Sequence, residues 1–214
     1  MTLPSASAPN GSIPPPPPVG EGRLARRKAR TRAAIVAAAS ALLHEQGYEH
    51  TSMQQIAERA DAGVGTLYGY FRSKDEVLRE VLQDHANSAI ERYRAAVDAR
   101  TPPIDRLCVA LNTMADYITE NRVILLAAFR WNARTMQPVE HPASWLHGTF
   151  SQMLAAGIES GHFRPLPVDV TARMLLSTYS LAMLGIGPWH GLEDDPATLA
   201  QLEAMTRALL DAGR

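Results

Sequence analysis

Two helix-start signals lie close together in the first third of this chain, and they restrict what it can fold into. Ser52 is followed by Gln55, and Ser73 by Glu76, which is the spacing at which two side chains cap the start of a helix reciprocally. The segment between them is too short for more than two short helices. We therefore predict helices from Ser52 to about 60, over 64–71 and from Ser73 to about 99, with a tight turn over 61–63.

Apolar residues recur at helical spacing along the rest of the chain, with no alternating strand pattern and no internal repeat. A preceding helix is predicted over 24–46, with Ile35 and Leu42 on one face. Gly47 follows it and suits the left-handed backbone conformation that often ends a helix. The predicted fold class is therefore all-α, with about nine helices. The remaining helices are expected at about 104–119, 122–137, 143–160, 169–186 and 196–212.

Composition excludes several classes of protein. Apolar residues make up 46% of the 214 residues, enough to bury a core, and the formal net charge of −1 argues against coating of nucleic acid by bulk charge. No apolar run is long enough for a membrane span, and the N-terminus lacks the apolar centre of a secretory signal. Cys108 is the single cysteine, so no internal disulfide can form. We expect Cys108 to be a core residue of a cytoplasmic protein.

The residues that usually carry chemistry form no recognisable catalytic or metal-binding pattern. The seven histidines show no metal-ligand spacing, and the chain has no phosphate-cradling glycine loop and no nucleophile motif. We therefore predict no catalytic residue, no metal and no cofactor. An all-α enzyme with a pocket in residues 104–186 is the alternative, and no residue pattern supports it.

Positive charge is concentrated near the N-terminus. Residues 23–32 carry six basic side chains and no acidic one, and they open the first predicted helix. This run is compatible with sequence-independent attraction to nucleic acid and also with a solvated face. Residues 1–22 include five consecutive prolines at 14–18. They are predicted to form a disordered or polyproline-II arm, with a proline-motif ligand for another domain as the alternative.

One side of the predicted helix over 64–71 is almost bare. Its apolar stripe comprises Val64, Leu67 and Phe71. At about 100° per residue, Gly65, Thr66 and Gly69 point the other way, with Tyr68 and Tyr70 on the flanks. Each interior glycine costs a helix about 1 kcal/mol relative to alanine, so close approach to another body is the natural reason for two of them. Two short helices, a tight turn and an outward second helix describe a helix-turn-helix, whose second helix enters the major groove.

The stretch TSMQQIAERADAGVGTLYGYFRSKDEVL, from Thr51 to Leu78, resembles the N-terminal pattern of the tetracycline-repressor (TetR) family of bacterial regulators. The resemblance extends from Arg30 to about Leu82. The later residues are similar to the family only in length, helix count and the phrase IESGHFRP at 158–165. For the fold, the resemblance implies a three-helix DNA-binding domain and, after it, a larger helical domain.

The resemblance implies DNA contacts at seven positions. Phosphate contacts are implied for Ser52, Thr66, Tyr68 and Lys74, and groove contacts for Gln54, Gly65 and Tyr70. Three positions depart from the family pattern. Asp61 stands where a glycine is usual in the turn, and Asp tolerates left-handed backbone better than most residues. Gly63 replaces a serine cap, and Gly69 replaces a larger side chain, so base readout leans on other groove residues and on DNA shape.

The resemblance also implies a homodimer. The helix over 169–186 is apolar almost all round, the final helix has one apolar stripe, and the family dimerises through this pair as a four-helix bundle. A dimer places two recognition helices one DNA turn apart, so that they read a palindrome. Packing of both helices within their own chain is the alternative.

A small-molecule pocket in the larger domain is a further implication. Arg130, Arg134 or His147 are candidates to anchor an acidic group of the ligand, and Asp116 or Glu120 a cationic one. Each wall candidate taken singly also fits an ordinary core position. The wall candidates are large and apolar or amphipathic, and comprise Met114, Trp131, Trp145, Phe150, Met153, Met174, Tyr179 and Met183.

Together these features predict a ligand-responsive DNA-binding transcriptional regulator. The simplest form is a repressor that binds a palindromic operator in double-stranded DNA as a homodimer and is released by a small-molecule effector. A ligand-independent DNA-binding regulator is the alternative within this class. The predicted organisation is an arm over 1–22, a helix-turn-helix domain over 23–72 and a ligand-binding and dimerisation domain over 73–214.

Overall fold

The computed structural model describes the backbone of residues 19–135 and 144–213, and the side chains of 22–128 and 146–213. Over these ranges the chain is all-α, as predicted, and each predicted helix is present with its ends within a few residues of the expected positions. The helices are α1 (Val19–His50), α2 (Met53–Arg59), α3 (Val64–Tyr70), α4 (Lys74–Ala96), α5 (Pro103–Glu120), α6 (Arg122–Thr135), α7 (Ser144–Glu159), α8 (Val168–Leu184) and α9 (Pro196–Leu210).

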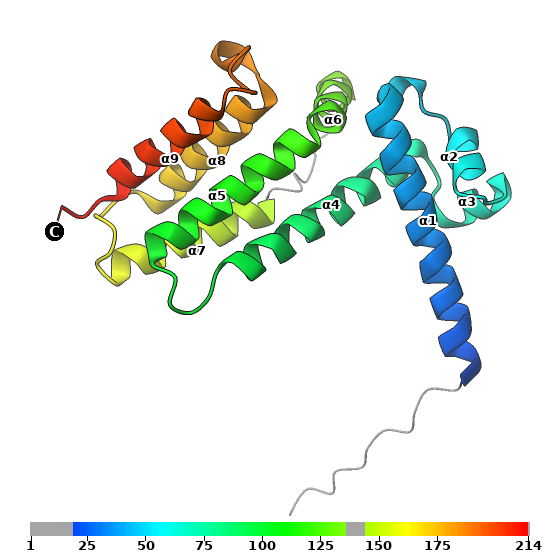
Figure 1. Cartoon of the computed structure of the whole chain (residues 1–214), viewed down its shortest axis with the longest axis horizontal. Coiled ribbons are helices and arrows are strands. Elements are labelled where there is room, and N and C mark those ends of the chain that lie inside the picture. The colour runs from blue at the N-terminus through cyan, green and yellow to red at the C-terminus, as the bar shows by residue number, and fades with distance from the viewer. Residues whose placement is uncertain (1–18, 136–143, 214) are drawn as a thin grey trace, which may run out of the picture.

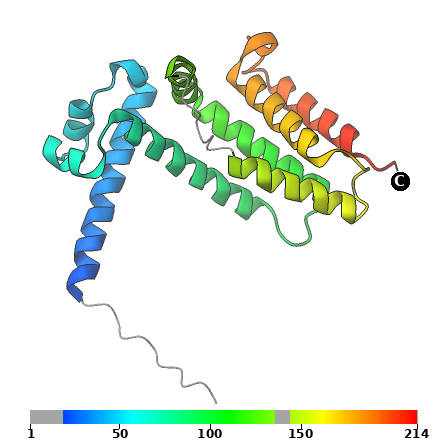
Figure 2. The same ribbon diagram turned by 180° about the vertical axis from the view of Figure 1, so that it is seen from behind.

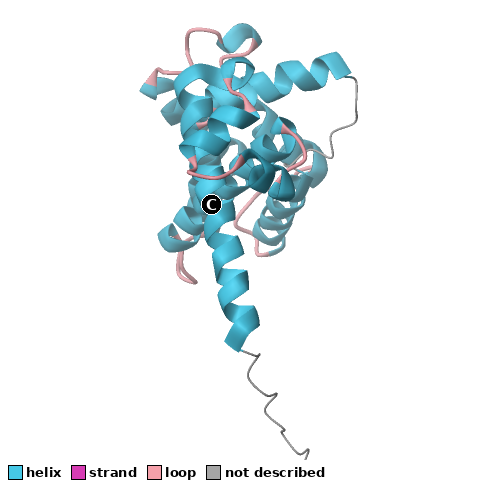
Figure 3. Cartoon of the chain, turned by 90° about the vertical axis from the view of Figure 1, so that its right-hand side faces the viewer, coloured by secondary structure: helices cyan, strands magenta, loops and turns pink. Residues whose placement is uncertain are grey.

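The molecule has a small helical unit at one end and a larger bundle at the other (Figure 1). The small unit contains α1, α2 and α3, and α4 runs from it toward the bundle formed by α5, α7, α8 and α9. The same arrangement is seen from behind in Figure 2. The view in Figure 3 shows only helices and loops along the described chain. The three-helix unit is therefore joined to the bundle by one long helix.

The small unit has its own apolar core. Ile35 and Leu43 of α1, Ile56 of α2, and Leu67 and Phe71 at α3 are at most 1% exposed and pack together. The turns that allow this packing are those expected from the sequence. Gly47 interrupts α1 with a φ of 78°, and Asp61 has a φ of 49° in the turn after α2.

This first core extends past the predicted domain boundary at residue 72. Val77 and Val81 of α4 are buried in it, and Ile124 of α6 is also a member. The small unit is therefore packed directly onto two helices of the larger part. One predicted core residue is wrong: Val64 is 39% exposed, because it lies in the first turn of α3 and faces solvent.

The larger part is built around a second apolar core with polar ties at its rim. Tyr179 of α8 is 1% exposed, and its hydroxyl lies 3.2 Å from the hydroxyl of Thr206 on α9. Arg207 of α9 pairs with Asp105 of α5 at 2.8 Å and with Glu203 at 2.8 Å. Hydrogen bonds from Asn112 and then Arg207 hold the pKa of the Glu203 carboxyl below its usual range. These contacts fix α9 against α5 and α8.

Several sequence-based expectations can be compared with the described residues. Residues 19–22 begin α1 instead of ending an arm, and residues 1–18 lie outside the described part of the chain. Cys108 is buried, as expected, and burial raises the pKa of its thiol to about 11. No helix in the described part of the chain is both long and apolar enough to cross a membrane. Within the same residues, no group of three or more His, Cys, Asp or Glu side chains is arranged to hold a metal ion.

Two glycines of α7 provide a test of the packing. A Cβ at Gly157 would lie 2.1 Å from the Phe163 ring, whereas a Cβ at Gly148 would meet nothing within 4 Å. We expect Gly157→Ala to lower the free energy of unfolding by about 1–3 kcal/mol through overpacking. Gly148→Ala should raise it by up to about 1 kcal/mol, because alanine favours a helix over glycine. Urea denaturation followed by circular dichroism measures both, and equal effects of the two changes would contradict the close Gly157–Phe163 packing.

Candidate nucleic-acid interface

The α2–turn–α3 unit is held by local hydrogen bonds that the sequence predicts. The backbone N–H of Gln55 donates to Ser52 Oγ at 3.2 Å, and the backbone N–H of Ser52 donates to Gln55 Oε1 at 2.8 Å. This is the predicted capping box, and Ser52 is the N-cap of α2. Gly63 is the N-cap of α3 without a side-chain bond, as expected for a glycine in that place. The start of each short helix is therefore set locally.

The outer face of α3 is open to solvent. Gly65, Thr66 and Gly69 are all exposed, and a Cβ added at either glycine would meet nothing within 4 Å. On the opposite side, Leu67 is fully buried and anchors the helix. The backbone of α3 is thus presented to the outside without side chains that would keep another molecule at a distance.

The two tyrosines of α3 differ in their surroundings. The side chain of Tyr68 is 51% exposed, so its hydroxyl is free to meet a ligand from solvent. Tyr70 is half-buried, and its ring packs against the core of the small unit. A packed ring has few available rotamers, so the hydroxyl of Tyr70 has a more defined position than that of Tyr68.

Lys74 is held by backbone groups in a way that the sequence did not reveal. Its Nζ donates to the carbonyl of Tyr48 at 2.7 Å and to the carbonyl of Thr51 at 2.9 Å, and lies 4.0 Å from the centre of the Tyr48 ring. These carbonyls belong to the C-terminal end of α1 and the residues after it, where a cation is favourable. An ammonium has three N–H donors, and the two carbonyls take two of them.

The neighbouring Tyr48–Asp75 contact fixes the same corner. The Tyr48 hydroxyl donates to Asp75 Oδ1. Burial, followed by the interaction with Asp75, raises the pKa of Tyr48, so the phenol stays protonated and donating. The start of α4 is therefore joined to the end of α1 by both a phenol and an ammonium.

Gln54, the predicted groove residue of α2, is exposed. Its amide nitrogen donates to Glu58 Oε1 at 3.1 Å. The amide oxygen lies on the exposed side chain and can accept from a base. A base contact by the amide nitrogen requires it to leave Glu58, which lies one helical turn further on.

An open groove of ≈ 530 Å³ runs along the end of α3 and the start of α4. It contains two exposed cations, Arg72 and Arg79, that the family pattern did not indicate. The sequence did contain a signal for them. Both arginines lie within a few residues of Lys74 and Glu76 at the predicted start of a helix, and therefore near the predicted contact face. The groove is lined by Tyr68, Gly69, Tyr70, Arg72, Ser73, Glu76 and Arg79.

The predicted ligand-contacting residues of the larger part are only partly brought together. Met114, Phe150, Tyr179 and Met183 are buried members of one core cluster, and Met153 packs against it. Met174 does not face this interior. Its side chain is 57% exposed, because it lies on the outer side of α8. The side chains of Trp131, Trp145, Arg130 and Arg134 lie outside the described residues.

Two of the three remaining anchor candidates already have a charged neighbour. His147 Nε2 lies 3.1 Å from Asp169 Oδ1. Glu120 pairs with Arg92 at 3.0 Å, whereas Asp116 is exposed. An acidic ligand group that binds His147 has to displace Asp169. A cationic ligand group that binds Glu120 has to displace Arg92.

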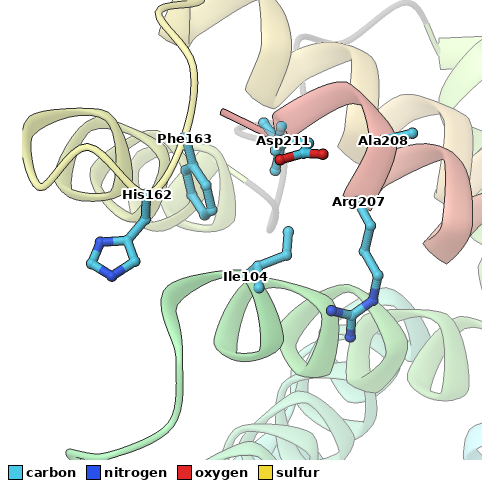
Figure 4. Close-up of a pocket in the computed structure, with 7 residues that line it drawn as sticks. Ile104, His162, Phe163, Arg207, Ala208 and Asp211 are labelled. Carbon is cyan, nitrogen blue, oxygen red and sulfur yellow. The ribbon is translucent and has the colours of Figure 1, made fainter. Parts of the chain in front are cut away.

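A separate cavity of ≈ 340 Å³ lies at the far end of the bundle. In Figure 4, Ile104 of α5 and Phe163 of the α7–α8 connection approach it from opposite sides, and Arg207 extends from α9 toward α5. Because Arg207 is already paired with two carboxylates, its charge is compensated. None of the lining residues was predicted from the sequence as a ligand contact.

Comparison with known proteins identifies what the chain is similar to. The profile described as "Bacterial regulatory proteins, tetR family" matches residues 35–81. The HTH-type transcriptional repressor KstR2 of Mycobacterium tuberculosis (strain ATCC 25618 / H37Rv) is 29% identical over 163 residues, covering 73% of this chain and 81% of the relative. The HTH-type transcriptional activator FasR of Mycolicibacterium smegmatis is 33% identical over 103 residues, 47% of each protein.

Two solved structures extend the comparison to the fold. The fatty acid degradation regulator FadR from Bacillus halodurans matches with a TM-score of 0.66 at 19% identity, covering 86% of this chain and 96% of the other. The ketosteroid transcriptional regulator KstR2 of Mycobacterium tuberculosis matches with a TM-score of 0.56 at 26% identity, covering 84% and 94%. Both the small unit and the larger bundle therefore have counterparts in solved proteins.

Replacing Lys74 by methionine separates its two possible roles. Lys74→Met keeps most of the stem but removes both bonds to the carbonyls, so we expect it to lower the free energy of unfolding by about 1–3 kcal/mol. If the third N–H also meets a phosphate, the slope of log affinity for duplex DNA against log salt should become shallower by about one unit. Denaturation and fluorescence anisotropy measure the two effects.

Arg72→Met is the matched control for stability, because the Arg72 side chain is exposed in the same groove and forms no ion pair with a described residue. It should leave the free energy of unfolding nearly unchanged. A Lys74→Met protein with reduced stability and an unaltered salt slope would show that Lys74 only joins helices and does not contact DNA.

Proposed function

This chain belongs to the tetR family of bacterial regulatory proteins. On that premise we propose that it is a homodimeric repressor that binds a palindromic operator and leaves it when an apolar effector binds. It is a DNA-binding transcriptional regulator and not an enzyme. The observation that carries the proposal is the bare, solvent-facing side of α3 beside exposed cations. We place the protein in the cytoplasm, where the chromosome is accessible to it.

In this proposal α3 enters the major groove. Gly65 and Gly69 let its backbone approach the base edges, and Thr66 contacts a phosphate beside them. The exposed Tyr68 hydroxyl donates to a phosphate, whereas the more rigid Tyr70 hydroxyl contacts the groove. Gln54 reads a base from α2, with its amide oxygen as acceptor. Ser52 and Lys74 hold phosphates at the two helix starts.

The proposed dimer contact is the outer face of α8 and α9. Val170, Met174 and Leu181 follow one another along α8 at helical spacing and are 54%, 57% and 39% exposed. Met205 of α9 is 58% exposed. A surface helix normally buries its apolar stripe, so these side chains favour a second copy of the chain as their partner. In this proposal the two-fold dimer reads half-sites on successive turns of the operator, which lie about 34–36 Å apart.

The effector is proposed to be largely apolar, of the fatty-acid or steroid type. Two kinds of support exist. The core of α5, α7 and α8 presents methionine and aromatic side chains, which adapt to apolar ligands. Relatives and structural neighbours include a ketosteroid regulator and a fatty acid degradation regulator.

The route from effector to DNA is proposed to pass through the α5–α6 turn. The side chain of His44 on α1 contacts the carbonyl of Glu120 at the end of α5, 3.1 Å away. His85 of α4 contacts Asn121 Oδ1 on one side and Ser40 Oγ, at 3.0 Å, on the other. A ligand that moves the end of α5 therefore acts on α1 and α4 together, and changes the separation of the two α3 helices. A coupling of about 1–3 kcal/mol alters operator affinity about 5- to 150-fold.

Binding to labelled duplex DNA tests the function. We expect the protein to bind DNA from the region beside its own gene more tightly than a scrambled duplex, with a steep negative salt dependence. Among added long-chain acyl compounds and steroids, at least one should lower operator affinity about 5- to 150-fold. Fluorescence anisotropy measures both. Absence of binding to any duplex at low salt would end the regulator proposal, and binding that no compound alters would favour a ligand-independent regulator.

The dimer face is tested by introducing a charge. Met174→Glu should give a monomer by size-exclusion chromatography with light scattering, because a buried unpaired carboxylate disfavours the interface. Operator affinity should fall, since one recognition helix reads only a half-site. Val123→Glu is the matched control: Val123 on α6 is 55% exposed, close to the exposure of Met174. A dimeric Met174→Glu protein, or a monomer produced by both changes, would place the contact elsewhere.

A further inference from the structure

We propose that Arg122 is a positioning residue: its ion pair with Asp194 fixes the small unit relative to the helices of the dimer contact, and so sets which half-site spacing the protein accepts. Arg122 is the first residue of α6, and Asp194 lies in the connection of residues 185–195 between α8 and α9. The inference rests on the proposed function, because it presupposes a dimer through α8 and α9 that binds two half-sites. It adds the contact that holds the two α3 helices at one separation.

The two side chains of the pair meet through two parallel hydrogen bonds. Nη1 of Arg122 donates to Oδ2 of Asp194 at 3.1 Å, and Nη2 donates to Oδ1 at 2.5 Å. Paired bonds between a guanidinium and a carboxylate fix the direction of approach as well as the distance. Hydrogen bonding to Arg122 holds the pKa of the Asp194 carboxyl below its ordinary value, so both partners are charged at neutral pH.

This contact differs from an ordinary surface ion pair. An exposed pair contributes little, because water solvates both charges, and the Asp194 side chain is 77% exposed. The Arg122 side chain, however, is only 19% exposed, and its buried Nε has no hydrogen-bond partner in the described part of the chain. A guanidinium that is largely withdrawn from water is costly without an anion. Arg122 therefore favours the arrangement in which Asp194 reaches it.

Asp194 is mounted on a connection that is fixed to both dimer helices. A Cβ at Gly185, the C-cap of α8, would lie 2.6 Å from the carboxylate carbon of Glu193, so Glu193 packs directly over the end of α8. On the other side, Thr198 Oγ1 of α9 donates to the carbonyl of Leu192 at 2.8 Å. The position of Asp194 therefore follows the position of α8 and α9.

Arg122 is mounted on the part of the molecule that moves with the small unit. Ile124, two residues further along α6, is 1% exposed and belongs to the first core, to which α1 also contributes. The preceding residue, Asn121, is buried, and its Oδ1 meets His85 of α4. Along the described chain, α6 packs chiefly against α1 and only sparsely against α5 and α8. The pair is therefore a direct link from the small unit to the α8–α9 connection.

The position of this link matters because the small unit is far from the dimer contact. Figures 1 and 2 show α6 and the α8–α9 connection, in orange, at the same end of the bundle, with α1, α2 and α3 beyond them. A small rotation at the link consequently displaces α3 by a larger distance. One base pair moves a half-site by about 3.4 Å along the duplex and turns it by about 35°. A fixed link therefore restricts the dimer to one spacing, whereas a loose link accepts several and has to be ordered on binding.

Spin-label distances in the free dimer test the link without DNA. A cysteine introduced at the exposed Glu49, at the end of α1, carries the label. Cys108 is buried, and burial raises the pKa of its thiol to about 11, so it stays unlabelled. Double electron–electron resonance should give one narrow distance between the two labels in the parent dimer. Asp194→Ala should broaden it into several separations, while light scattering still shows a dimer.

Operators with altered spacing test the consequence for DNA binding. The probe is the duplex beside its own gene that the parent binds, with half-sites located by footprinting and one base pair added or removed between them. The parent should bind both altered duplexes at least about 10-fold more weakly. Asp194→Ala should bind the unaltered duplex about 5- to 20-fold more weakly than the parent does, and should differ by less than about 3-fold among the three spacings. Affinity for a duplex with one half-site should be unchanged.

Two further variants separate positioning from general stability. Asp105→Ala is the matched control, because it removes a carboxylate from an ion pair with Arg207 at 2.8 Å that joins α5 to α9 within the bundle. It should keep the label distance and the spacing preference of the parent. The exchange Arg122→Asp with Asp194→Arg should restore both properties, because an aspartate is favourable in the first turn of a helix.

The outcomes distinguish this inference from the proposed function. A parent that binds no duplex, or that is a monomer, ends the proposed function and the inference with it. If the parent dimer binds its operator and Asp194→Ala keeps one narrow distance and the same spacing preference, only the inference is wrong. A monomeric Asp194→Ala protein, equal broadening in Asp105→Ala, or an exchange that restores neither property would also overturn the positioning role.

Discussion

The packing of α1 against α4 and α6 is the contact on which the rest of the structure depends. Ile35 and Leu43 of α1 share one core with Val81 of α4 and Ile124 of α6. The position of α3 follows from this core, because Leu67 and Phe71 are anchored in it. An element that moves α4 or α6 must therefore move the outer face of α3, since close-packed cores shift between discrete arrangements and do not stretch. Hydrogen bonds of His44 and His85 to the α5–α6 turn add a polar connection beside the apolar one.

Local contacts in the small unit compensate for the low stability of α3, which has two glycines on its outer face. Two glycines in a helix of seven residues weaken α3. Capping at Ser52, the left-handed Asp61 and the buried Leu67 set its position from one side. The Lys74 ammonium and the Tyr48 phenol join the start of α4 to the end of α1 from the other. A weak helix can thus present bare backbone because its two ends are held by neighbours.

Local signals in the sequence were sufficient for the helices and the turns. Capping residues, Gly47 and Asp61 act through their own backbone or through residues three or four positions away, so their effect can be read from the chain. Contacts between distant segments could not be read in this way. The bonds from Lys74 to Tyr48 and Thr51 depend on how α1 meets α4, and the exposure of Met174 depends on how α8 is rotated in the bundle. Helical periodicity also predicted that Val64 is buried, and this was wrong. Periodicity indicates on which face of a helix a residue lies, but not whether the first turn of that helix is covered by other elements. The seven predicted DNA contacts and the pocket wall stay predictions.

Charge distribution, and not total charge, decides how such a chain can meet DNA. The net charge is −1, yet residues 23–32 carry six basic side chains and no acidic one. At physiological ionic strength the screening length is about 8 Å, so a phosphate near residues 23–32 interacts with that run and little with the acidic residues of the bundle. This uneven distribution lets the basic N-terminal end of α1 attract a duplex although the chain as a whole carries a slight negative charge.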